Sequence, residues 1–247
     1  MKKTFVLLLT LALVPACTFA VDGVVLINQS TVMAAGGFPY VIRDHGSYKL
    51  SGNLTVTTTS DAIDINADDV TLDLNGFSIV GSVTCSGSPP VCSASAANGV
   101  LAVSHQNVTV KSGIVRGFSR GVQIVGGGAS GGLIADLQAS GNSDYGIYAV
   151  DVVIVRCSAN NNGGYGMAVV NGTVSDSTAN RNRFDGFTPY GSTFIHNAAN
   201  DNGRYGIAGV LPSYPFLFGS NTFLNNKTSD AVGGTSQNNN LSSAGPC

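Results

Sequence analysis

The chain has 247 residues, a formal net charge of −2 and a hydrophobic content of 43%, with 32 glycines and no tryptophan. All 14 acidic residues are aspartates, which fits a chain of strands and turns because glutamate favours helices. The low charge and the lack of a basic patch argue against nucleic acid as a partner. This length accommodates one repeat domain behind a short export signal.

The first 20 residues are predicted to be a secretory signal peptide. Two lysines precede the apolar segment Phe5–Val14, and residues 18–20 form a cleavage site. The apolar segment is shorter than the roughly 20 residues of a membrane-spanning helix, and no other segment could span a membrane. An alternative is a lipoprotein anchored at Cys17, but the proline two residues earlier favours cleavage after Ala20. We expect a secreted or periplasmic protein whose mature charge is 10 − 14 = −4.

Between the signal and the regular repeats, residues 21–60 are predicted to form an N-terminal cap and a first coil. Residues 24–27 have the composition of a strand, and residues 48–56 have the pattern of a coil. A cap here would cover the exposed end of a repeat structure. Residues 61–232 are predicted to form the repeat domain, and the Asn- and Ser-rich residues 233–247 a flexible tail.

An insertion interrupts the early part of the repeat domain. Residues 82–97 are rich in Ser, Pro, Ala and Cys and are predicted to form a loop. We expect Cys85 and Cys92 to form a disulfide in this loop, because an exported protein can keep one. Cys157 is expected to be a buried core residue, with a reactive thiol as the less favoured alternative, and its pairing with Cys247 is not expected.

A period of 20 residues runs through the segment 134–206. It is carried by glycine, alanine, asparagine and apolar columns: Gly146, Gly166, Gly186 and Gly206; Ala139, Ala159, Ala179 and Ala199; Asn142, Asn162, Asn182 and Asn202; and Ile134, Ile154, Val174 and Phe194. A fixed period of this length is typical of a solenoid, in which each repeat stacks on the last. The asparagine column suits an internal ladder of hydrogen-bonded amides.

Each repeat is predicted to consist of short strands and turns. Apolar and β-branched runs alternate with clusters of Gly, Asn, Ser and Asp, and no apolar run keeps helical spacing for three turns. Equivalent positions then stack as parallel strands about 4.8 Å apart. Right-handed crossovers are preferred, and the hexapeptide rhythm of a left-handed β-helix is missing. The sequence predicts an all-β fold, a single-stranded right-handed parallel β-helix of about eight coils.

Three segments of the chain resemble the repeats of pectin-lyase-like, right-handed β-helix proteins: residues 70–79, 113–118 and 161–166. The resemblance covers roughly residues 46–232 and implies an exported β-helix of the NosD-like secreted type. The superfamily includes polysaccharide lyases, hydrolases and epimerases, but the matching motifs specify coils rather than chemistry. The polygalacturonase pattern of Asn-Thr-Asp, Asp-Asp and Gly-His-Gly is not present, and neither is the Asp-Pro-His-Asp motif of alginate epimerases.

A charged column is the first candidate site. Its members are 20 residues apart and should stack on adjacent coils: Asp136, Arg156, Asp176 and His196. As a catalytic pair, the two aspartates would lie about 9–10 Å apart, near the upper end of the separation in inverting glycosidases. Arg156 between them should lower both carboxyl pKa values, whereas a general acid needs a raised pKa. An exposed salt-bridge ladder is therefore favoured over a catalytic set.

An aromatic column is the second candidate site. It comprises Tyr145, Tyr165, Asp185 and Tyr205, with Arg183 and Arg204 nearby. Tyrosines at strand spacing can form a stacking platform for sugar rings, while charged groups bind hydroxyls or carboxylates. The alternative is an aromatic ladder that braces the turns before each glycine. This column is the best candidate for a binding surface.

No metal site or cofactor is predicted. The three histidines are scattered, and no cluster has the ligand spacing of a zinc site. Calcium is a weak alternative, suggested by the density of aspartates at Asp61, Asp64, Asp68, Asp69 and Asp73. Residues 68–69, however, have the composition of an ordinary turn.

Three hypotheses remain open for the function. The favoured one is an exported, non-catalytic β-helix that binds a polysaccharide or a surface partner along its side. The second is a polysaccharide-active enzyme (a lyase, hydrolase or epimerase) that uses the charged column, and the third is a structural surface protein. The missing catalytic motifs and the lack of Glu and Trp favour the first or the third.

Overall fold

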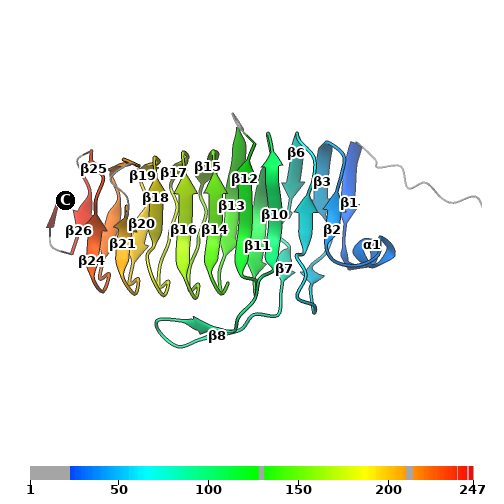
Figure 1. Ribbon diagram of the computed structural model, residues 1–247, viewed down its shortest axis with the longest axis horizontal. Coiled ribbons are helices and arrows are strands. Elements are labelled where there is room, and N and C mark those ends of the chain that lie inside the picture. Colours follow the sequence, from blue (N-terminus) through cyan, green and yellow to red (C-terminus); the bar gives the residue numbers. More distant parts are fainter. Residues whose placement is uncertain (1–22, 128–130, 210–213, 238, 244, 247) are drawn as a thin grey trace, which may run out of the picture.

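The computed structural model describes residues 23–127, 131–209, 214–237, 239–243 and 245–246. The expected signal peptide, Cys17 and Cys247 lie outside these residues. The described chain winds into an elongated right-handed parallel β-helix, with one short helix, α1 (Gln29–Ala34), at its N-terminal end (Figure 1). None of the described helices has the length and apolarity to cross a membrane.

Two long sheets form the main faces of the solenoid. The first sheet has 12 strands, of which ten follow the order β1 (Val24–Ile27), β3 (Gly46–Leu50), β6 (Val70–Asp73), β11 (Thr109–Arg116), β13 (Gly132–Ala139), β15 (Val152–Val155), β17 (Thr173–Ser175), β19 (Thr193–Ile195), β22 (Leu217–Gly219) and β25 (Thr235–Ser236); β4 (Leu54–Thr55) and β7 (Ser78–Val80) lie beside this path. The second sheet has nine strands in the order β2 (Tyr40–Ile42), β5 (Ile63–Ile65), β10 (Asn98–His105), β12 (Arg120–Gly126), β14 (Tyr145–Val150), β16 (Tyr165–Val170), β18 (Phe187–Tyr190), β21 (Tyr205–Ala208) and β24 (Ser229–Val232).

A narrower third sheet and one hairpin complete the architecture. The third sheet contains β20 (Ala198–Asn200), β23 (Thr222–Leu224), β26 (Leu241–Ser242) and β27 (Gly245–Pro246). The hairpin joins β8 (Cys85–Ser86) to β9 (Val91–Cys92) inside the expected insertion 82–97, and a disulfide links Cys85 to Cys92 as predicted. β25 and β26 extend the ladders into the stretch 233–247 that the sequence suggests as a tail.

The 20-residue period is the register of the solenoid. Tyr145 pairs with Tyr165, and Val153 pairs with Thr173, each across a parallel ladder. Each of the nine strands of the second sheet comes from a different coil, one more than the roughly eight expected. The additional coil is the last one, in which β24, β25 and β26 continue the three ladders into the stretch expected to be a tail.

The core is a column of apolar side chains between the sheets. Its largest fully buried residues include four phenylalanines: Phe118, Phe187, Phe194 and Phe223. The predicted asparagine ladder is present, since Asn162 Nδ2 donates to Asn182 Oδ1 over 3.0 Å and Asn182 Nδ2 donates to Asn202 Oδ1 over 3.1 Å. Stacked amides therefore satisfy polar groups that would be costly to bury unpaired.

A second ladder, which the sequence analysis missed, begins in the column of Cys157. Cys157 is buried, as expected, and forms no disulfide within the described part of the chain. Burial raises the pKa of its thiol to about 11, which disfavours a reactive thiolate. Further along the column, Asn197 Nδ2 donates to Asn221 Oδ1 over 3.1 Å, and Asn221 Nδ2 donates to Asn240 Oδ1.

The glycine column exists because neighbouring coils leave no room for a side chain. A Cβ atom on Gly186 would lie 2.7 Å from Ala199 Cβ and 2.7 Å from Gly206 O. Gly186→Ala is therefore expected to lower the free energy of unfolding by about 2 kcal/mol, through overpacking between coils. Urea denaturation measures this loss. Gly52→Ala is the matched control, because its nearest neighbour would be Asn28 Cβ at 3.7 Å; equal losses in both variants would contradict the explanation.

Candidate functional site

The charged column lies along the first sheet and consists of two ion pairs. Arg156 Nε and Nη2 donate to the two carboxylate oxygens of Asp136 over 2.7 and 2.9 Å. His196 Nδ1 lies 3.8 Å from Asp176 Oδ1, and all four side chains are exposed. Each residue also has a positive φ, between 50° and 58°, which places it at a tight bend of the coil.

The electrostatics of this column favour the ionised carboxylate of Asp136. The hydrogen bonds from Arg156 hold the pKa of Asp136 below its usual value. A carboxylate of this kind is a poor proton donor at neutral pH.

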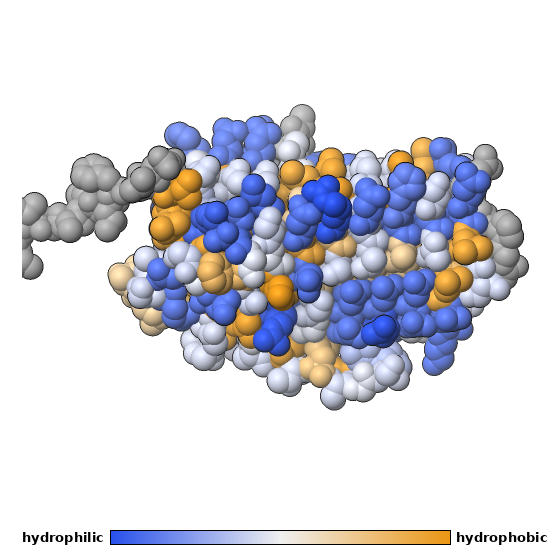
Figure 2. All heavy atoms as spheres, turned by 180° about the vertical axis from the view of Figure 1, so that it is seen from behind, coloured by the Kyte–Doolittle hydropathy of each residue, from blue (hydrophilic) through white to orange (hydrophobic). Residues whose placement is uncertain are grey.

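The column borders a shallow hollow of about 410 Å³ that also contacts Cys157 and Thr178. Figure 2 shows hydrophilic side chains arranged in rows along the long axis of the molecule, as expected for stacked coils.

The structure brings together only part of the predicted aromatic column. The rings of Tyr145 and Tyr165 stack with their centroids 5.1 Å apart and an interplanar angle of 14°. The next ring is that of Phe184, 5.3 Å from Tyr165, which the sequence analysis missed because it lies one position before Asp185 in the repeat. Aromatic contacts therefore continue across three coils, but the ring of Phe184 is tilted by 51° against that of Tyr165 rather than stacked on it.

The other members of the aromatic column have different surroundings. Asp185 is only 1% exposed, and its carboxylate accepts a hydrogen bond from Arg204 Nη2 over 3.1 Å. Burial raises the pKa of Asp185, and the charge of Arg204 opposes this rise. The guanidinium of Arg204 lies 5.4 Å from the ring of Tyr205, and that of Arg183 lies 5.5 Å from Phe184. Asp185 is thus buried and bonded to Arg204, whose guanidinium lies over the aromatic rings, rather than facing solvent.

A hollow of about 390 Å³ opens beside the stacked tyrosines on the outer face of the second sheet. Four tyrosines surround it together with two small aliphatic residues: Tyr145, Tyr148, Tyr190, Tyr214, Ala168 and Val170. We call this the tyrosine hollow. The sequence does contain a pattern that indicates outward-facing tyrosines here, because Tyr148 and Tyr190 occupy strand positions that alternate with buried residues. The 20-residue period does not reveal the tyrosine hollow, because its tyrosines occupy different positions of the repeat.

Polar groups accompany the tyrosine hollow. The Arg120 guanidinium lies 5.6 Å from the ring of Tyr145 and 5.4 Å from that of Tyr148. Thr188, in register with the floor residue Ala168, is 5% exposed, and its Oγ1 has no hydrogen-bond partner among the described residues. Aromatic walls, a cation and a hydroxyl are the groups that commonly orient a polar ligand in a mostly apolar site.

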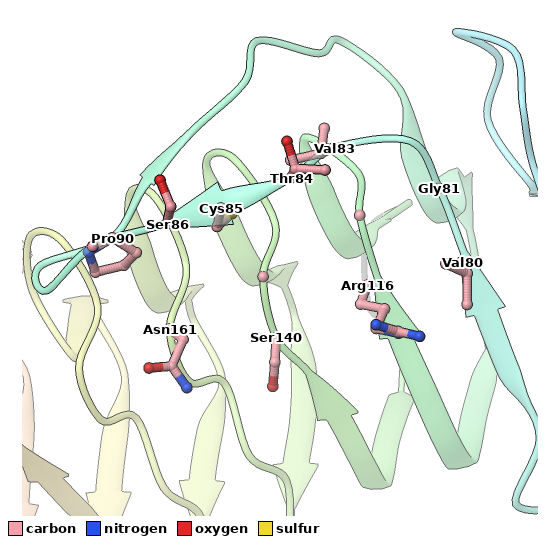
Figure 3. Close-up of a pocket in the computed structure, with 13 residues that line it drawn as sticks. Val80, Gly81, Val83, Thr84, Cys85, Ser86, Pro90, Arg116, Ser140 and Asn161 are labelled. Atoms are coloured by element: carbon pink, nitrogen blue, oxygen red, sulfur yellow. The ribbon is translucent and has the colours of Figure 1, made fainter.

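The disulfide hairpin covers a second, larger hollow of about 590 Å³ (Figure 3). The hairpin passes over the turns of several coils, and Arg116, Ser140 and Asn161 of these coils line the hollow. Cys92 Sγ lies 3.6 Å from Asn142 O, so the hairpin rests on the solenoid. Arg116 is the one charged residue that lines this hollow among the residues the structure describes.

The five aspartates that suggested calcium do not converge. Asp68 Oδ1 lies 3.1 Å from His105 Nδ1 and accepts from Gln106 N, while Asp69 Oδ1 accepts from Asn107 Nδ2 over 2.8 Å. Within the described ranges, no group of three or more His, Cys, Asp or Glu side chains could hold a metal ion.

Asp61 and Asp64 form a separate acid pair at the N-terminal end of the second sheet. Burial, followed by the charge of the neighbouring Asp61, raises the pKa of Asp64 to about 6.

Comparisons with known proteins agree with the fold. The family model for the right-handed β-helix region matches residues 20–202. Among solved structures, the Dettilon tailspike protein is similar with a TM-score of 0.61 and 13% identity, over 82% of this chain and 47% of that one. The Agl-KA catalytic domain gives a TM-score of 0.49 and 18% identity, over 78% and 43% of the two chains. The Azotobacter vinelandii mannuronan C-5 epimerase AlgE4 A-module gives 0.46 and 14%, over 88% and 77%.

The chain spans less than half the length of the first two of these structures. No curated protein matches the sequence. At these identities, the structural likeness is one of fold.

Proposed function

Since the chain belongs to the right-handed β-helix family, we propose that it is an exported protein that binds a polysaccharide along the outer face of its second sheet. A β-helix presents regularly spaced side chains on flat faces, and such a face suits a ligand that is itself a repeating polymer. The proposal concerns binding; it assigns no catalytic role to the charged column on the first sheet.

The tyrosine hollow is the observation that carries this proposal. Tyrosine offers an apolar ring face for stacking on a sugar ring and a hydroxyl for hydrogen bonding. The hollow of about 390 Å³ lies within the usual volume range of small-molecule sites, and a single sugar unit is small enough to enter it. The small residues Ala168 and Val170 at its floor would allow a ring to approach the sheet closely.

The groups around the hollow would supply polar contacts. Arg120 lies over the rings of Tyr145 and Tyr148, where its guanidinium could donate to sugar hydroxyls or carboxylates. A row of aromatic rings continues from the hollow along the solenoid axis, with Tyr165 stacked on Tyr145 and Phe184 tilted against Tyr165. This continuity supports a linear polymer over a single small sugar, because adjacent units of a chain could contact successive coils.

For the charged column, we propose a structural role. Asp136 and Arg156 form an exposed bidentate pair, and Asp176 lies beside His196 at a longer distance. Exposed pairs of this type contribute little to stability individually. A lowered pKa at Asp136 also opposes its use as a general acid.

Removal of one ring should weaken polysaccharide binding. A glycan array that includes alginate, polygalacturonate and neutral glucans would identify the ligand, and calorimetry would measure its affinity. Tyr148→Ala is expected to raise the Kd about tenfold, since loss of stacking and of the Arg120 contact removes roughly 1.4 kcal/mol. Val153→Ala, an exposed change on the first sheet, is the control and should leave the Kd unchanged. Failure of the wild-type protein to bind any glycan, or equal Kd values for wild type and Tyr148→Ala, would refute the proposal.

A further inference from the structure

The hollow of about 590 Å³ beneath the disulfide hairpin has no part in polysaccharide binding along the second sheet. We call it the hairpin hollow. It lies where strands of the first sheet end, since Arg116 is the last residue of β11 and Ser140 directly follows β13. The hairpin hollow and the tyrosine hollow have no lining residue in common. Any ligand of the hairpin hollow therefore occupies a second, separate site.

The hairpin is anchored to the solenoid on both sides of this hollow. Where the hairpin leaves the coil, Val83 N donates to Gly117 O over 2.9 Å. Near its tip, Pro90 is buried, and Cys92 Sγ lies 3.6 Å from Asn142 O. The disulfide between β8 and β9 holds the two strands of the hairpin together. The hairpin thus forms a fixed cover over the turns of the coils (Figure 3).

The polar side chains that line the hairpin hollow have no partners within the described part of the chain. Arg116 is exposed and forms no ion pair there, whereas Arg156 and Arg204 each contact the carboxylate of an aspartate. Four uncharged polar side chains of the lining also lack a hydrogen bond to any other described residue: Thr84, Ser86, Ser140 and Asn161. These groups are free to bind a ligand in place of water.

The charge of the hairpin hollow favours an anion. Among the described residues, no acidic side chain lines it, and the insertion 82–97 contains no charged residue. Arg116 is therefore a cation that the hairpin above it does not neutralise. Partial exclusion of water by the hairpin strengthens the attraction between this cation and an anion. The planar guanidinium fork matches a carboxylate, which it can bind through two parallel hydrogen bonds.

The hairpin hollow also has an apolar part. Val83 and Pro90 on the hairpin are buried, and Val80 on β7 is half-buried. An inorganic anion bound to the guanidinium would leave these surfaces without a contact, whereas an organic acid has an apolar body that can cover them. The volume lies within the usual range of small-molecule sites, which combine apolar walls with a few polar groups that orient the ligand.

We propose that the hairpin hollow binds a small organic carboxylate. Its carboxylate pairs with the guanidinium of Arg116, and its apolar body packs against Val83 and Pro90. The hydroxyls of Thr84 and Ser140 supply further hydrogen bonds. The proposal does not depend on polysaccharide binding, because it concerns a different hollow and different residues.

Titration of the full chain with benzoate, followed by ligand-observed NMR, tests the proposal. Benzamide has nearly the same shape but no charge, so it should bind at least about tenfold more weakly than benzoate. Inorganic phosphate has charge but no apolar body and should also bind more weakly. Arg116→Gln should raise the Kd of benzoate at least about tenfold. Arg181→Gln is the matched control, because Arg181 is exposed but does not line the hollow, and it should keep the wild-type Kd.

A second variant tests whether the hairpin forms part of the site. Replacement of both Cys85 and Cys92 by serine removes the cross-link and should raise the Kd of benzoate, and the Tm of each variant shows whether it is folded. A folded wild type that does not bind benzoate at millimolar concentration would overturn the proposal. Equal Kd values in the wild type and Arg116→Gln, an unchanged Kd without the disulfide, or phosphate binding as tight as that of benzoate would each do the same. Failure to bind glycans would reject only the proposed function.

Discussion

Replacement of Asn182 by alanine is expected to lower the free energy of unfolding by about 4 kcal/mol, because one side chain serves four hydrogen bonds in the core. Asn182 Oδ1 accepts from the backbone N and from Nδ2 of Asn162, each over 3.0 Å. Asn182 Nδ2 donates to Ala159 O over 2.9 Å and to Asn202 Oδ1 over 3.1 Å. The substitution removes all four and leaves a buried N–H and a buried carbonyl with lost partners.

Chemical denaturation of Asn182→Ala beside Asn66→Ala tests this expectation. Asn66 is exposed, so its replacement should change stability by less than about 0.5 kcal/mol. A loss of less than about 1 kcal/mol in Asn182→Ala would show that the ladder contributes little beyond ordinary packing. Because a solenoid is stabilised by contacts between adjacent coils, a large loss should also reduce hydrogen-exchange protection in the neighbouring coils first.

Truncation of Phe187 is expected to cost about 3–5 kcal/mol, the usual range for a buried phenylalanine replaced by alanine. Phe187 is fully buried, and its ring centroid lies 5.3 Å from that of Phe194 on the first sheet. It also pairs in register with Met167 and Ile207 on the two adjacent coils. Alanine would therefore leave a cavity bordered by both sheets and by three successive coils.

The Tm and the urea midpoint of Phe187→Ala measure this cost, with Val103→Ala as a control. Val103 lies on the second sheet but is 45% exposed, so its truncation should change stability little. Thr188 follows Phe187 on the strand beside the tyrosine hollow, so the cavity should also weaken glycan binding without removing any contacting ring. A Phe187→Ala protein as stable as Val103→Ala would mean that the core can collapse around the missing ring.

The two candidate sites predicted from the sequence agree with the structure to different degrees. The charged column stacks as its 20-residue spacing implies, and Arg156 contacts Asp136 directly. Asp185, by contrast, is buried and bonded to Arg204, although it occupies the same repeat position as three tyrosines. Column spacing gives the neighbour of a residue on the next coil, but it does not give the direction in which a side chain at a bend points.

The sequence alone determined the solenoid, because residues at equivalent repeat positions contact one another from coil to coil along one axis. Equal spacing of Gly186, Asn182 and their equivalents fixes the coil length, and each coil must repeat the backbone of the last for the amides to meet. The disulfide could also be predicted from the sequence, because Cys85 and Cys92 are close in the chain.

Only the tertiary structure decided which outward-facing residues gather on the surface. The tyrosine hollow combines tyrosines from two coils, β14 and β18, with Tyr214 from the segment before β22. Asp61 accepts hydrogen bonds from Asn98 across 37 residues, because the insertion 82–97 lengthens that coil and removes it from the regular period. Insertion lengths and bend angles set these contacts, and a repeat pattern does not encode them.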